Sequence, residues 1–209
     1  LYNESIFGRK TMIADIVGID YYPHEYSTAF SFCNLSDYLL ALDRLRDWNY
    51  GLVPTATFIQ PCDEARPGSS RLGTRTWSPP PNEAQVKNLI WLSFIHGVKV
   101  MSYFQYFEWF NTTPRPNLSP MQESLEWLED LASVILSAPE DVAMDVSVTV
   151  PSGYRVDFMT RLGENDDLYI FSGEVRDWDS DPIYYWPDPN GPTTAYFNIP
   201  TGSFTARFD

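Results

Sequence analysis

The sequence predicts an α/β fold in two parts. Strands alternate with helices over residues 1–139, and a small antiparallel β domain occupies residues 140–209. Two observations lead to this prediction. In the first part, three segments carry apolar residues at helical spacing, and each follows a short aliphatic run. Beyond Pro139, short runs with strand-like alternation are separated by turn residues, and no helical spacing is visible.

The first predicted element is a short buried strand that ends in polar side chains. Ile16, Val17 and Ile19 form an apolar run, and Pro23 ends the strand because it has no N–H group to donate. Acid, phenol and imidazole groups gather at its carboxyl end: Asp20, Tyr21, Tyr22 and His24. Such groups at the end of a buried parallel strand are typical of a binding site in an α/β barrel, and a plain polar turn is the alternative.

Two more strands follow, each after a helix. Leu39, Leu40, Leu42, Leu45 and Trp48 fall at helical spacing after Ser36, a predicted N-cap. The strand Leu52–Ile59 comes next and ends at Gln60, and a long polar loop covers residues 61–82. We expect parallel pairing with right-handed crossovers, because strand and helix alternate.

The next helix begins after Asn82 and closes at His96-Gly97. We interpret His96 as a helix-end residue near the dipole rather than as a catalyst. The strand Val98–Gln105 and the helix Met121–Ser137 complete the first part. The order indicates three consecutive units of a (β/α) barrel.

The second part is interpreted as a small antiparallel β-sandwich. Its predicted strands are Val146–Val150, Arg155–Arg161, Leu168–Phe171, Thr194–Ile199 and Ser203–Phe208.

Composition narrows the possible partners. The formal net charge is −14, which argues against nucleic acid or an anionic membrane because both require a basic face. No run of about 18 apolar residues occurs, so we expect no membrane span. Aromatic residues make up 16% of the chain, a content that suits stacking on sugar rings as well as a protein core. Two histidines make a poor ligand set, so we expect no metal and no cofactor.

The cysteines and the sequons favour a secreted glycoprotein. Cys33 and Cys62 follow two predicted strands, which allows either a disulfide or two free thiols. Glycosylation sequons begin at Asn3, Asn34, Asn111 and Asn117, the last being the weakest because Pro120 follows its Ser119. We expect glycans on at least one of Asn3, Asn34 and Asn111.

Several segments resemble a known enzyme class. These segments are "ADIVGIDYYP", "PPPNEAQVKNLIWLSFIHGVKVMSYF", the aromatic-rich "VMSYFQYFEW" and "LYIFSGEVRD". In this order they resemble the C-terminal half of a clan-A-like glycoside hydrolase, which is a TIM (β/α)8 barrel, followed by its accessory β-sandwich. The resemblance implies that Ile16–Tyr21, Leu52–Ile59 and Val98–Phe104 are strands six, seven and eight. The missing N-terminal barrel half would then come from another chain or from a longer parent polypeptide.

The resemblance also implies a set of site residues. Retaining glycosidases use two carboxyl groups about 5–5.5 Å apart. The nucleophile position at the end of strand seven corresponds to Gln60, whose carboxamide cannot form a glycosyl ester. A small shift in alignment would bring Asp63 or Glu64 there. The candidate catalytic carboxylates are therefore Asp20 and Glu108. The candidate substrate-binding residues are Tyr21, Tyr22, His24, Gln60, Tyr103, Gln105 and Trp109.

Two functions fit these residues, and a third is weakly supported. The first is a secreted glycoside hydrolase that acts on a polysaccharide. The alternative is a catalytically inactive, glycosidase-like extracellular protein with a carbohydrate-binding or structural assembly role, which Gln60 favours. An esterase or a metal-dependent hydrolase has little support, because no G-x-S-x-G motif occurs.

Strand alternation makes a specific prediction about Asp20. Ile19 and Tyr21 must lie on the opposite side of the strand from Asp20. If Ile19 faces the helices, Asp20 faces the barrel axis beside Gln60 and Gln105. The alternative role is structural, with the Asp20 carboxylate accepting hydrogen bonds from backbone N–H groups of the next loop.

Overall fold

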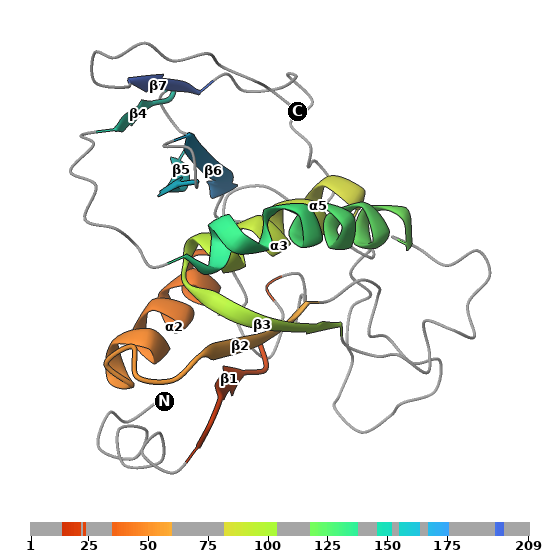
Figure 1. Cartoon of the computed structure of the whole chain (residues 1–209), viewed down its shortest axis with the longest axis vertical. Coiled ribbons are helices and arrows are strands. Elements are labelled where there is room, and N and C mark those ends of the chain that lie inside the picture. Colours follow the sequence, from red (N-terminus) through yellow and green to blue (C-terminus); the bar gives the residue numbers. More distant parts are fainter. Residues whose placement is uncertain are drawn as a thin grey trace, which may run out of the picture.

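The computed structural model describes much of the predicted regular structure. The described residues are 14–21, 23, 35–59, 82–103, 118–137, 146–151, 155–163, 167–175 and 195–198. They form three layers in Figure 1: a parallel sheet at the bottom, two helices across the middle and antiparallel strands at the top.

The lower layer is a three-stranded parallel sheet. It consists of β1 (Val17–Ile19), β2 (Thr55–Ile59) and β3 (Val98–Tyr103), in the order β1-β2-β3. Helix α2 (Leu35–Trp48) connects the first two strands and helix α3 (Glu83–Ile95) the next two. Both strand pairs are parallel, which confirms the predicted alternation of parallel strands and helices.

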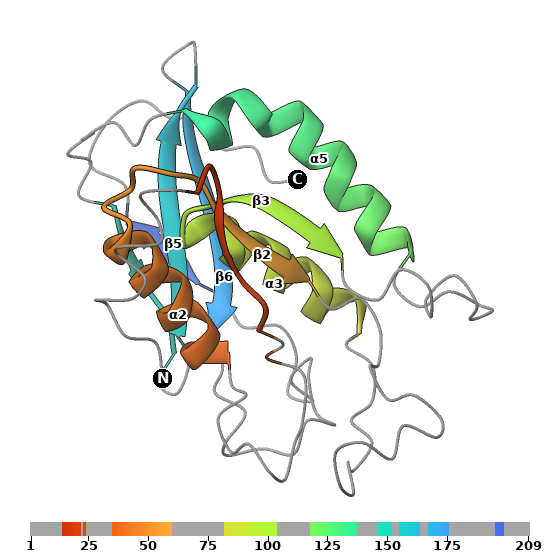
Figure 2. The same ribbon diagram turned by 90° about the horizontal axis from the view of Figure 1, so that it is seen from below.

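Alternation divides the sheet into a covered face and an open face. Val17, Ile19 and Ile59 are buried on the face that the helices cover. On the open face, Ile16, Phe58 and Val100 keep 50%, 37% and 38% of their surface exposed. Figure 2 shows α2 and the last helix, α5 (Leu118–Leu136), near opposite edges of this sheet, α2 toward β1 and α5 toward β3.

A buried polar cluster joins α2 to its neighbours. The Tyr38 hydroxyl lies 3.0 Å from Thr57 Oγ1 on β2 and 2.7 Å from Ser93 Oγ on α3. Ser93 Oγ in turn donates to the Leu89 carbonyl over 2.6 Å. Burial raises the pKa of Tyr38 to about 12, because the phenolate would be desolvated. The cluster fixes α2 relative to both the sheet and α3.

Helix α3 begins with a reciprocal capping box. The Asn82 N–H donates to Gln85 Oε1 over 2.8 Å, and the Gln85 N–H donates to Asn82 Oδ1 over 2.9 Å. The helix ends at His96, and Gly97 adopts φ 89°, a left-handed conformation that glycine accepts without strain. These signals confirm the helix limits expected from the sequence.

The hairpin of β5 (Arg155–Leu162) and β6 (Leu168–Val175) lies on the other side of α3. The Asn88 side chain hydrogen-bonds the β6 backbone twice. Its Nδ2 donates to the Glu174 carbonyl over 2.8 Å, and the Glu174 N–H donates to its Oδ1 over 3.0 Å. A Cβ added to Gly173 would lie 2.7 Å from Leu92 Cγ, so the β6 backbone packs directly against the Leu92 side chain there.

A row of aromatic rings runs from α5 through α3 to β6. Trp91 on α3 lies between Trp127 on α5, with ring centroids 6.1 Å apart, and Phe171 on β6, with centroids 5.6 Å apart. Tyr169 continues the row 6.4 Å from Phe171. The Lys87 ammonium pairs with Glu123 and lies 5.7 Å from the Trp127 ring centroid. These contacts hold α5 and the hairpin to α3.

A second antiparallel pair consists of β4 (Ser147–Thr149) and β7 (Tyr196–Asn198). Phe158 of β5 and Phe197 of β7 meet edge to face, with ring centroids 5.6 Å apart. The antiparallel pairing predicted after Pro139 is therefore confirmed for both strand pairs.

The predicted portion of a TIM (β/α)8 barrel is wrong for the described residues, and so is the predicted β-sandwich. The parallel sheet is an open three-stranded sheet, and the antiparallel strands form two separate pairs. A hairpin can bury its apolar face against a helix as well as against a second sheet, and β5–β6 does so against α3. Strand alternation cannot distinguish between these two partners.

The close contact between β6 and α3 is testable by adding one methyl group. Gly173→Ala should lower the free energy of unfolding by about 1–3 kcal/mol, because the new Cβ overlaps Leu92. Denaturant unfolding followed by circular dichroism measures this loss. Ser172→Ala, on the exposed side of the same strand, should change it by less than about 0.5 kcal/mol. Equal midpoints for the two variants would contradict this packing.

Candidate functional site

The structure places three of the predicted site residues, and it separates them. Ile19 is 5% exposed on the covered face, and Asp20 is exposed on the open face, as alternation predicts. Tyr21 is half-buried and belongs with Ile19 on the covered face. Asp20 and Tyr21 therefore lie on opposite faces of the sheet and cannot hold one sugar ring between them.

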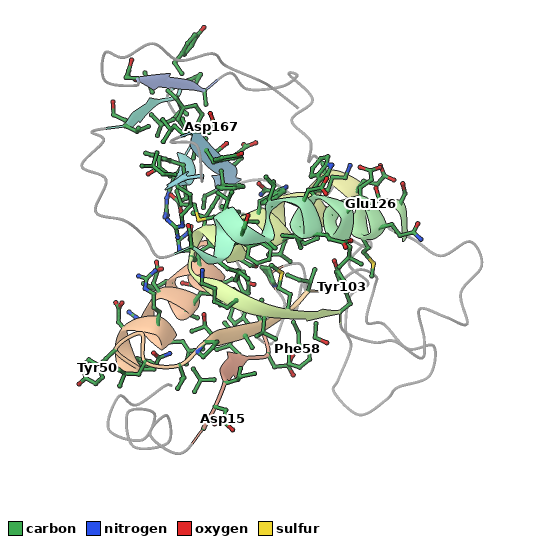
Figure 3. All side chains as sticks on the ribbon, in the orientation of Figure 1. Asp15, Tyr50, Phe58, Tyr103, Glu126 and Asp167 are labelled. Carbon is green, nitrogen blue, oxygen red and sulfur yellow. The ribbon has the colours of Figure 1, made fainter. Side chains whose placement is uncertain are left out.

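Tyr103 also lies on the covered face. Thr55 pairs with Val98 and Ala56 with Val100, so Lys99 is an extra residue in β3 that shifts the alternation. Beyond this shift, Val100 and Ser102 are exposed, whereas Tyr103 packs against the core. Burial raises the pKa of Tyr103 to about 12. Figure 3 shows Tyr103 and Phe58 at the same end of the sheet.

The other predicted site residues lie outside the described part of the chain. They are Tyr22, His24, Gln60, Gln105, Glu108 and Trp109, together with Asn3, Asn34, Asn111, Cys33 and Cys62. Their roles therefore stay predictions.

The described residues line a groove between β1 and α2. Its volume is about 180 Å³. Ile19 at the end of β1 and Tyr21 just beyond it line one side, and Asp37, Arg44 and Trp48 line the groove from α2. The remaining lining is aliphatic: Leu40, Ala41 and Leu45. An apolar surface with a few charged groups at defined positions is typical of a ligand site.

The groove follows one side of α2. Asp37, Ala41, Arg44 and Trp48 recur every three or four residues, so they form a single stripe along the helix. The stripe is roughly 16 Å long, from eleven rises of about 1.5 Å between Asp37 and Trp48. Such a length suits an extended ligand better than a compact one.

The Tyr21 ring, which lines the groove, packs against a buried tyrosine of α2. The Tyr21 ring lies against the Tyr38 ring, with centroids 5.9 Å apart and planes at 41°. Tyr38 is fully buried and hydrogen-bonded to β2 and α3, so it has little freedom to move. This support keeps the Tyr21 ring in place, which lowers the entropic cost of ligand binding.

Sequence reasoning assigned the α2 residues to one apolar face, but the structure divides them. Leu39, Leu42 and Leu45 are at most 1% exposed and belong to the core. Leu40 is 44% exposed, and it lines the groove with the half-buried Trp48. A signal was present in the sequence, because Asp37 and Arg44 share the helical stripe of Trp48 rather than that of the core leucines.

No protein-family model, curated protein or solved structure matches this chain. Among the described residues, no helix is long and apolar enough to cross a membrane. The same residues contain no cluster of three or more His, Cys, Asp or Glu side chains able to hold a metal ion.

The position of Asp20 leads to a stability prediction. Asp20→Asn should leave the free energy of unfolding within about 0.5 kcal/mol of the wild-type value, because the side chain is exposed on the open face. Denaturant unfolding at neutral pH tests this. A loss of about 2 kcal/mol would show instead that the carboxylate holds the following loop in place.

Proposed function

We propose that this is a secreted, glycoside hydrolase-like protein that binds carbohydrate, and that a saccharide lies in the groove between β1 and α2. One observation carries the proposal. Two aromatic residues, Tyr21 and Trp48, line the same groove as the carboxylate of Asp37 and the guanidinium of Arg44.

This combination matches the chemistry of a sugar ring. The C–H faces of a pyranose are apolar and pack on aromatic rings, while its hydroxyl groups need hydrogen-bond partners. A carboxylate accepts such bonds and a guanidinium donates them. The aliphatic lining from Ile19 and Leu45 removes water from the apolar faces of the sugar.

Hydrolysis is a second candidate, favoured by the exposed carboxylate of Asp20 at the carboxyl end of β1. A retaining mechanism needs a second carboxyl group about 5–5.5 Å away. Glu108, the partner that the sequence suggests, lies outside the described residues. Loss of hydrolysis in Asp20→Asn with unchanged binding would support this candidate.

Binding is tested by removing one groove ring at a time. Trp48→Ala and Tyr21→Ala should each weaken binding to soluble polysaccharides about tenfold or more, or about 1.4 kcal/mol, because the stacking surface is lost. Affinity electrophoresis against a panel of neutral and acidic polysaccharides identifies the ligand, and calorimetry then measures Kd.

The matched control is Tyr50→Ala. Tyr50 is an aromatic residue at the same end of α2 as Trp48, but it is 78% exposed and does not line the groove. Its replacement should leave Kd unchanged. The proposal fails if the panel shows no binding, or if the groove variants bind as tightly as the control.

Secretion is tested independently of binding. Protein from its natural source should carry glycans on at least one of Asn3, Asn34 and Asn111, because these residues begin sequons. Intact mass before and after endoglycosidase treatment measures this. An unchanged mass would contradict the proposed secreted glycoprotein.

A further inference from the structure

His96 joins three elements that are far apart in the sequence. It caps the C-terminus of α3 and is 8% exposed. Its Nδ1 lies 3.0 Å from Asp43 Oδ1 on α2, and its Nε2 lies 3.1 Å from Asp157 Oδ2 on β5. The imidazole ring therefore bridges two carboxylates, one from each side of the end of α3.

This geometry favours a doubly protonated imidazole ring. A neutral imidazole has one N–H donor and one lone pair, whereas an ionised carboxylate only accepts hydrogen bonds. Both ring nitrogens face carboxylate oxygens, so the imidazolium, which donates from both nitrogens, is the form that satisfies both contacts. Burial opposes this charge, but the hydrogen bonds with Asp157 and Asp43 raise the pKa of His96 above its usual value.

Each of the two carboxylates also has an arginine partner. Arg46 Nη1 lies 3.2 Å from Asp43 Oδ1 on α2. On β5, Arg155 donates from Nε to Asp157 Oδ1 over 3.0 Å and from Nη2 to Asp157 Oδ2 over 2.7 Å. Burial opposes the charge on Asp157, yet the bonds from His96 and Arg155 lower the pKa of this carboxyl below its usual value. As pH rises, His96 is the member of the cluster that loses a proton.

We propose that His96 is a proton-dependent tie, which fastens α2 and the start of β5 to the end of α3 at low pH and loosens both as pH rises. Deprotonation leaves a lone pair on one ring nitrogen, and that lone pair faces a carboxylate oxygen. One hydrogen bond is therefore lost, and the nitrogen lone pair then repels the carboxylate oxygen that it faces.

The loosening is local, because β6 has other attachments. Asn88 holds the β6 backbone at Glu174, and Leu92 packs against Gly173, and neither contact involves an ionisable group of α3. The stabilisation by His96 is complete below the unfolded pKa of about 6.5 and is lost as pH rises through the higher folded pKa.

Amide hydrogen exchange on the full chain tests the tie. With intrinsic rates corrected, the amides of β5 near Asp157 should lose protection between about pH 5.5 and about pH 8.5. The loss should be about tenfold for each unit by which the folded pKa exceeds the unfolded one. Amides of β6 near Glu174 should keep their protection over the same range.

Two variants separate the tie from general pH effects. His96→Gln should abolish the pH dependence in β5, because glutamine does not titrate. The matched control is His24→Gln, which removes the other histidine of the chain and should leave the pH dependence intact. Equal pH dependence in His96→Gln and wild type would overturn the proposal.

A direct titration gives a readout that does not depend on any variant folding. The ring C–H signals of His96 in wild-type protein should report a pKa above the usual value of about 6.5 in an NMR titration. A value at or below about 6.5 would also overturn the proposal.

Discussion

The burial of α3 on several sides is the constraint on which the rest of the structure depends. Val86, Leu89, Ile90 and Leu92 are at most 1% exposed, and together they point in several directions around the helix. The parallel sheet covers one side, the β5–β6 hairpin covers another, and α5 lies alongside. A helix that is apolar all round is stable in water only when every side has a partner, so α3 requires all of these elements at once.

Polar contacts then set the orientation of the elements around α3. The side-chain amide of Asn88 makes two hydrogen bonds with the backbone of Glu174, as a neighbouring strand would, and so fixes the position of β6 along α3. The hydroxyl of Tyr38 fixes the position of α2 relative to α3. Buried polar groups of this kind contribute specificity because only one arrangement satisfies their hydrogen bonds. These contacts also fix the shape of the groove. Tyr38 packs against Tyr21 on one side of the groove, and it belongs to α2, which forms the other side.

Charged side chains also fix the positions of elements relative to one another. The chain carries a formal net charge of −14, so a cation placed between acidic residues is strongly favoured. His96 lies between Asp43 and Asp157, at the junction of α2, α3 and β5. The same α2 that lines the proposed binding groove with Arg44 and Trp48 is held from its other side by this histidine.

The sequence alone determined where the elements lie and how neighbouring strands run. Apolar spacing identified α2, α3 and α5, the strand–helix alternation predicted parallel pairing, and alternation placed Asp20 opposite Ile19. Tertiary structure alone decided what each apolar face contacts. The hairpin lies on α3 rather than in a sandwich, the extra residue Lys99 moves Tyr103 to the covered face, and packing separates Leu40 and Trp48 from the core leucines. The physical reason is that periodicity records which side of an element avoids water, whereas the partner on that side depends on contacts between residues far apart in the chain.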